Sequence, residues 1–326
     1  MNHARRIALV AGLQFAVMCG PGALQAQEMF PTKPVHIVIG FTPGGGIDTV
    51  ARLLAPKLAE AWKQSVIVEN KPGANGVLAT QLVAAAPPDG HTILFGTTGN
   101  LSVNPVFRKD LPFDMARDFA PVTQTSSVAF LVMSNPQLPV KTLPELITYA
   151  QANPGKVSFA SSGTGGLPHL AEELLNSSAG MGAVHVPYKG SAPALTDVIG
   201  GQVQFIIDAA AIGLPNVKAG RVRALATTGK QRLSFMPDVP TVGETLPGFE
   251  VVNWYGMVVP AGTPASAIKT IQTAIAKAME DPELREKLIA QGTDPVGSTP
   301  EVFGAFMKAE STRWEKVIKD AGIKAE

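Results

Sequence analysis

Cysteine is almost absent from this 326-residue sequence: the one cysteine, Cys19, lies near the N-terminus. The segment around it resembles a secretory leader, because Arg5 and Arg6 precede a short apolar run and then small residues ending at Ala26. We therefore predict a signal peptide over 1–26, cleaved near Ala26; the alternative is a buried N-terminal helix. The mature chain would contain no cysteine, which excludes disulfides, a thiol nucleophile and a cysteine-rich metal site.

A surplus of positive charge is also missing. The formal net charge is +1, and removing 1–26 takes away two arginines and no acid, which leaves −1. Such a balance gives no general attraction for nucleic acid, and we expect no nucleic-acid partner. After residue 26 no stretch has the length and apolar character of a transmembrane helix. The chain is therefore expected to be exported without a membrane anchor.

Several catalytic motifs are missing as well. There is no phosphate-binding P-loop, no Gly-x-Ser-x-Gly nucleophile turn and no His-Glu-x-x-His metal motif. Gly44 and Gly46 match the first two positions of a dinucleotide fingerprint, but Thr49 occupies the third, where glycine or alanine is needed. His169 has Glu172 and Glu173 close by, yet no third metal ligand is apparent, so a polar histidine near a helix start is the favoured interpretation. We predict no enzyme activity, no cofactor and no metal.

Short apolar strands alternate with helical patterns, which predicts an α/β fold. Helix starts are marked three times near the C-terminus, where Thr263-Pro264, Asp281-Pro282 and Thr299-Pro300 place a capping residue before proline. The strands are expected at 35–41, 65–69 and 92–95, and then at 128–133, 157–161, 184–187, 205–207 and 222–226.

Two strand–loop–helix units share one design. The strands 35–41 and 157–161 each run into a loop rich in Gly, Ser and Thr, and a helix follows. The first N–H groups of a helix have no intrahelical acceptor, and the helix dipole makes that end partly positive. Such an end binds carboxylate or phosphate without Lys or Arg. The alternative for each loop is an ordinary tight turn.

Ordered motifs along the chain resemble those of a known family. The segment from Phe30 to Asp48 strongly resembles the N-terminal signature of the tripartite tricarboxylate transporter receptors, also called Bug or TctC-like proteins. The resemblance spans about residues 30–265 and continues through 68–76, 88–94, 113–114, 118–122, 154–158, 185–190, 240–241 and 260–264.

The resemblance implies a two-lobed, type II-like periplasmic-binding-protein fold with the ligand cleft between the lobes. It implies one lobe from 27–127 plus 250–326 and a second from 128–249, closing about a hinge near residues 127 and 250. The implied function is capture of a small carboxylate in the periplasm: a di- or tricarboxylate, an acidic amino acid or an aromatic acid. The partners would be the large and small permease subunits of a tripartite transporter, with the receptor a monomer. The alternatives are a sensor that passes the ligand signal to a kinase and, more remotely, an exported hydrolase.

In this family the loop after the first strand and a facing loop in the other lobe hold the ligand. Carried onto this chain, the ligand-binding candidates are Phe41, Thr42, Pro43, Gly44, Gly45, Gly46 and Asp48 in the first loop, Ser161, Ser162, Gly163, Thr164 and Gly165 in the second, and Asn75, Thr97, Tyr188 and Asp208 elsewhere. Asp48 has two open interpretations, as a helix cap or as an acceptor for a ligand group. Gly46 departs from many relatives, which have Ser, Ala or Pro there. Because neither loop contains a basic residue, we expect the ligand carboxylate to be bound by backbone N–H groups and hydroxyls.

Overall fold

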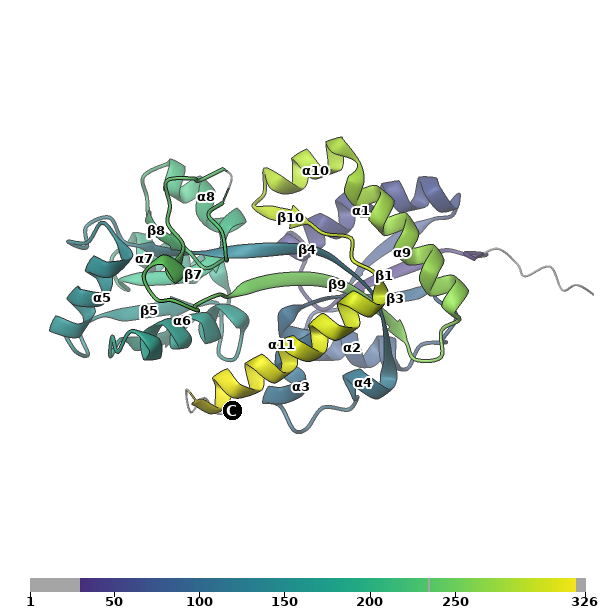
Figure 1. Cartoon of the computed structure of the whole chain (residues 1–326), viewed down its shortest axis with the longest axis horizontal. Helices are drawn as coiled ribbons and strands as arrows, with labels where there is room; N and C mark the ends of the chain where they lie inside the picture. The colour runs from purple at the N-terminus through teal and green to yellow at the C-terminus, as the bar shows by residue number, and fades with distance from the viewer. Residues whose placement is uncertain (1–29, 234, 321–326) are drawn as a thin grey trace, which may run out of the picture.

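The computed structural model describes residues 30–233 and 235–320. The expected signal peptide and its cleavage site lie outside the described residues. Two lobes are joined by two long strands, which run side by side from one lobe to the other (Figure 1). Among the residues that the structure describes, no helix is both long and apolar enough to cross a membrane.

The first lobe is built on a mixed sheet in the order β2-β1-β3-β9-β4. Its strands are β1 (Val35–Ile39), β2 (Val66–Asn70), β3 (Thr92–Thr97), β9 (Val252–Pro260) and the first part of β4 (Phe119–Ser134), with β10 (Thr293–Pro295) paired to β4. Its helices are α1 (Gly46–Trp62), α2 (Val77–Ala84), α3 (Asn104–Phe107), α4 (Met115–Asp118), α9 (Ala265–Glu280) and α10 (Pro282–Ile289), with short turns η1 (Ala74–Gly76) and η2 (Gly99–Val103). Val50, Leu54 and Leu58 of α1 are buried in this lobe's core, and each such side chain contributes roughly 1.5–3 kcal/mol.

The second lobe has a smaller sheet. Its strands are β5 (Ser158–Ser161), β6 (Val184–Pro187), β7 (Phe205–Ala209), β8 (Arg223–Thr227) and the last part of β4. Its helices are α5 (Leu143–Ala152), α6 (Leu167–Ser178), α7 (Ser191–Ile199) and α8 (Ala210–Lys218), with a short turn η3 (Val242–Glu244). Strands β5, β6 and β7 are parallel, so their carboxyl ends lie at one edge.

Strand β4 belongs to both lobes. Its residues up to Ala129 pair with β9, whereas Phe130 and the residues after it pair with β7. The sequence predicted only the later part of this strand, because Thr123, Thr125 and Ser126 are polar although they are fully buried. The predicted lobe boundaries near residues 127 and 250 lie close to this change of partners, and the division itself stays a prediction.

Helix α11 (Pro300–Asp320) packs on both lobes, as Figure 1 shows. Near its start Phe303 contacts Trp254 in the first lobe, with ring centroids 5.5 Å apart. Farther along, Trp314 is buried in the hydrophobic core of the second lobe. Glu310 accepts hydrogen bonds from the indole N–H groups of Trp254 and Trp314, both at 3.2 Å. This helix is therefore buried against both lobes, and the assignment of 250–326 to the first lobe stays a prediction.

Candidate functional site

The first glycine-rich loop joins β1 to α1. Gly45 precedes the helix in an extended conformation (φ −76°), and its carbonyl accepts the N–H of Thr49 at 3.0 Å. Only Gly44 in this loop has a left-handed conformation, with φ +84°. The first N–H groups of α1 are therefore presented at the end of the strand, without an intrahelical acceptor.

Asp48 holds this loop in place from behind. Its carboxylate accepts hydrogen bonds from the Gly44 N–H, the Arg52 Nε and the Asn70 Nδ2, all at 2.9 Å. Burial acts to raise the pKa of Asp48, but these hydrogen bonds, the largest from Arg52, outweigh it and hold the pKa below its usual value. Asp48 therefore stays ionised and works as a local anchor for Gly44.

A steric contact explains the third consecutive glycine, Gly46. A Cβ at Gly46 would lie 2.6 Å from the hydroxyl oxygen of Tyr255, on β9. Atoms that are not bonded do not approach so closely, so any larger residue here would displace that buried ring. Gly46 is thus the point at which the backbone of α1 can approach β9.

The second glycine-rich loop joins β5 to α6 and is also built on glycine conformations. Gly163 (φ +144°) and Gly165 (φ +75°) both lie in the left-handed region, and Gly166 precedes the helix. A Cβ at Gly165 would meet the ring of Phe107, from α3 in the first lobe, at 2.8 Å. The second loop therefore lies directly against the first lobe.

A cavity of about 530 Å³ lies between the two loops. The beginnings of α1, α6 and α7 all line it, through Gly45, Gly166 and Gly190, so partly positive helix ends converge on the cavity. None of the described residues that line it is Lys or Arg. Two larger hollows, of about 1050 and 790 Å³, lie beside α11 and are not lined by either loop.

The structure brings ten of the predicted residues to this cavity: Phe41, Thr42, Gly45, Gly46, Asn75, Thr97, Ser162, Gly163, Thr164 and Asp208. The other six do not line it: Pro43, Gly44, Asp48, Ser161, Gly165 and Tyr188. Most of these six residues form hydrogen bonds to groups that do not line the cavity. The Tyr188 hydroxyl, for example, donates to Asp197 at 2.6 Å, and burial, followed by Asp197, raises the pKa of Tyr188 to about 12.

Sequence reasoning missed three polar residues that line the cavity, Asn253 and Tyr255 of β9 and Ser191 at the start of α7. The Asn253 side-chain oxygen is buried without a hydrogen-bond partner. Asn253 and Tyr255 are two positions apart, which places them on one face of a strand. This alternation was available in the sequence, but β9 itself was not predicted.

Buried carboxyl groups lie in the wall of the cavity and behind it. Asp208, on β7, lines the cavity, and one of its oxygens accepts the Ala209 N–H at 2.7 Å while the other has no partner. Burial raises the pKa of Asp208, and the nearby Ser191 and the Ala209 N–H offset that rise only in part. Burial also raises the pKa of Glu172 on α6, whose carboxyl accepts the Ile207 N–H at 2.6 Å. Burial favours the neutral form of both groups, and a neutral wall would not repel an anion.

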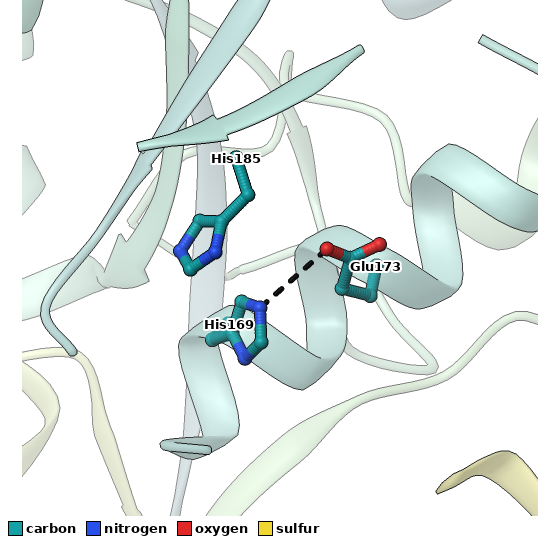
Figure 2. Close-up of side chains that lie close together, drawn as sticks. All are labelled: His169, Glu173 and His185. Carbon is teal, nitrogen blue, oxygen red and sulfur yellow. Dashed lines mark ion pairs between the residues drawn. The ribbon is translucent and has the colours of Figure 1, made fainter. Parts of the chain in front are cut away.

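Behind the second loop, His169, Glu173 and His185 lie together, with potential metal-ligating atoms within 4.8 Å of one another (Figure 2). The structure thus supplies the third group that the sequence did not reveal. However, the two imidazoles are stacked, with centroids 4.0 Å apart and planes 26° apart. Their in-plane lone pairs therefore run side by side and do not converge on one point. The Nδ1 of His169 also already accepts the Gly165 N–H at 3.1 Å.

The same cluster contains a contact of the kind that hydrolases use. The Ser161 hydroxyl and the His185 Nε2 are 2.6 Å apart, a pair that sequence reasoning did not find. Ser161 is fully buried and does not line the cavity, so a substrate has no access to it. Burial, followed by the charge of His169, lowers the pKa of His185 to about 4, which makes it a weak base. The arrangement fits a structural contact better than a nucleophile.

A family model and a similar protein sequence both match this chain over most of its length. A family model described as the tripartite tricarboxylate transporter family receptor matches residues 50–323. The UPF0065 protein of the tcbD-tcbE intergenic region in a Pseudomonas strain is 38% identical over 326 residues, covering 99% of this chain and 96% of that protein.

Solved structures agree in fold. A Rhodopseudomonas palustris protein solved with adipate has a TM-score of 0.84 and 36% identity, covering 90% of this chain and 99% of its own. MatC from Rhodopseudomonas palustris, solved with bound malate, has a TM-score of 0.79 and 32% identity, covering 89% and 100%. The periplasmic binding protein BugD has a TM-score of 0.81 and 32% identity, covering 91% of this chain and 100% of its own, which confirms the expected two-lobed binding-protein fold.

Proposed function

We propose that this chain, which belongs to the tripartite tricarboxylate transporter family of receptors, captures a small carboxylate in the cavity between its two glycine-rich loops. The family predicted from the sequence motifs is thereby confirmed. The observation that carries the proposal is the cavity of about 530 Å³, on which the starts of α1, α6 and α7 converge without a Lys or Arg among its described lining residues.

The ligand carboxylate is held by the backbone N–H groups of Gly45 and Gly46 in the first loop and of Ser162 and Thr164 in the second. The hydroxyls of Thr42, Ser162 and Thr164, which also line the cavity, add to these. Each hydrogen bond to a charged group contributes about 1.5–3 kcal/mol. Several of them, after ordering costs, would give micromolar affinity, or about 8 kcal/mol. Phe41, Ile47 and Phe130 offer apolar surface for the rest of the ligand. Support for this ligand class comes from two similar proteins that were solved with adipate and with malate.

A thermal-shift screen of carboxylic acids tests the proposal. Adipate and malate are the first probes, and 1,6-diaminohexane is a matched control with the length of adipate and the opposite charge. A ligand at about a thousand times its Kd stabilises the folded state by about 4 kcal/mol, so the melting temperature should rise by several degrees. If no acid raises it, or if the diamine raises it equally, carboxylate capture is wrong.

We further propose that the protein acts in the periplasm without catalysis, after cleavage near Ala26, and delivers its ligand to the large and small permease subunits of a tripartite transporter. N-terminal sequencing of protein from a periplasmic extract should begin at or near Gln27, and an intact Met1 would contradict cleavage. Ligand capture should close the lobes about the β4 and β9 connections. Small-angle scattering should then give a smaller radius of gyration with saturating ligand.

A further inference from the structure

Two histidines, His169 and His185, lie close together beside Glu173, as Figure 2 shows. His169 lies in the first turn of α6 and His185 on β6, and their rings stack with centroids 4.0 Å apart. Glu173, one turn after His169, has a carboxylate oxygen 3.5 Å from the His169 Nε2. Phe159 of β5 stacks on His185 at 5.1 Å, with the planes 20° apart. His169 is only 4% exposed, whereas Glu173 and His185 are partly buried.

Each histidine contacts one end of the loop. The Gly165 N–H donates to the Nδ1 of His169 at 3.1 Å. The Ser161 hydroxyl is 2.6 Å from the His185 Nε2. Between these two anchored residues lie Ser162, Gly163 and Thr164, which line the cavity. The imidazoles therefore hold the two ends of the segment that faces the ligand.

The proton arrangement of His169 follows from its partners. Because Nδ1 accepts the Gly165 N–H, it carries no proton, so the neutral ring carries its proton on Nε2, the atom closest to Glu173. A second proton can bind only at Nδ1. A proton on Nδ1 would leave that atom no lone pair with which to accept the Gly165 N–H. It would also place the Nδ1–H group directly against the Gly165 N–H group. Protonation of His169 is thus incompatible with the observed position of Gly165.

We propose that His169 and His185 are positioning residues for the second loop, and that protonation of His169 releases the Gly165 N–H and weakens carboxylate binding. The second half of this proposal rests on the proposed function, whereas the first half stands on the loop alone. Neither histidine touches the ligand cavity, so the effect is transmitted through Ser161 and Gly165.

The charged surroundings are compatible with one added proton. Burial, followed by the charge of His169, lowers the pKa of His185 to about 4, so His185 is neutral at pH 6. The hydrogen bond with His169 is the main cause that lowers the pKa of Glu173, which therefore remains an anion beside the pair. On the same helix, Glu172 is engaged with the Ile207 N–H on β7, and Phe159 offers His185 an uncharged face.

The first test needs no ligand. In protein labelled with ¹⁵N-histidine and ¹⁵N-glycine, His169 should appear as the Nε2–H tautomer at pH 8. The Gly165 amide should shift as the pH falls to 6, in step with the His169 ring nitrogens. In His169→Phe, which keeps a ring in the stack but has no acceptor, that pH response should disappear. His36→Phe is the matched control, because His36 also contacts a glutamate, Glu69, but in the first lobe.

The second test measures adipate binding by calorimetry at pH 8 and pH 6. At pH 8, His169→Phe should bind adipate about tenfold more weakly than the parent. Between pH 8 and pH 6 the parent should lose further affinity, and His169→Phe should not show this further loss. His169→Gln, whose amide oxygen can accept the Gly165 N–H, should restore affinity at pH 8 without restoring the pH dependence. His36→Phe should bind as the parent does at both pH values, and any weakening that remains in His169→Phe at pH 6 measures protonation of adipate itself.

Different failures have different meanings. If the Gly165 amide ignores both pH and the His169→Phe change, the positioning role is wrong, whatever adipate does. If the amide responds as expected but the parent does not bind adipate, the positioning role of His169 stands and capture of adipate is wrong. If His169→Phe binds adipate as tightly as the parent with an unchanged pH profile, protonation of His169 does not govern binding.

Discussion

The loop that precedes α1 and the loop that precedes α6 both join a parallel strand to a helix, and both line the same cavity. They differ in what anchors them. Behind the first loop, Asp48 is ionised and bonded to Arg52 and Asn70, a set whose charges do not change near neutral pH. Behind the second, His169 and His185 take the same place. One backbone design can therefore be fixed or pH-responsive, depending on the side chains behind it.

The largest effect should follow from removing the fixed anchor. Asp48→Ala breaks hydrogen bonds from Gly44, Arg52 and Asn70. Because each hydrogen bond to a charge contributes about 1.5–3 kcal/mol, the free energy of unfolding should fall by roughly 3 kcal/mol, measured by urea titration. Asp110→Ala, which breaks an exposed pair with Arg108, is the control and should cost less than about 0.5 kcal/mol. Equal losses would mean that the hydrogen bonds of Asp48 contribute no more to stability than an exposed ion pair does.

Blocking the first loop should weaken binding by about a hundredfold. Gly45 has an ordinary φ of −76°, and a Cβ there would meet only the Thr42 carbonyl, at 3.8 Å. Gly45→Val should therefore fold normally while its methyl groups keep the ligand from the helix N–H groups. Gly45→Ala is the milder control. Calorimetry with adipate would contradict this if Gly45→Val bound as tightly as the parent, because the first loop would then be only a turn.

A hydroxyl in the second loop should matter less than the backbone. Thr164→Ala removes at most one hydrogen bond, which corresponds to about 1 kcal/mol, or roughly a fivefold loss of adipate affinity. Thr164→Ser keeps the hydroxyl and should bind almost as the parent does. A loss in Thr164→Ala as large as that in Gly45→Val would show that side chains, and not backbone N–H groups, dominate this loop.

The smallest effect is expected for a change of pH at the first loop, where the anchor should not respond at all. The lowered pKa of Asp48 means that its stabilising interactions are present above the ordinary aspartate pKa near 4 and are lost only as the pH falls through the still lower folded value. Between pH 8 and 6 the Gly44 amide signal should therefore stay constant, while that of Gly165 moves. Equal movement of both amides would remove the contrast between the loops.

Local signals in the sequence were sufficient for much of the fold. Asp281 caps α10 by accepting the Leu284 N–H at 2.9 Å, and α11 begins at Pro300, both as predicted. Helix α9 begins at Ala265, one residue later than expected, because the Thr263 hydroxyl donates to the Pro260 carbonyl and does not cap the helix. Such signals act within a few residues of the chain, so a single sequence contains them in full.

The sequence by itself also determined the α/β class, the glycine-rich loops and the absence of basic residues from them. Only the tertiary structure decided which loop atoms face the cavity, since Asp48 and Gly165 proved to be bonded behind it. It also brought His185 onto His169, and Tyr255 to within contact of Gly46. These juxtapositions depend on strand order and on how the lobes pack, which are set by contacts between residues far apart in the chain. No local pattern of residues encodes them.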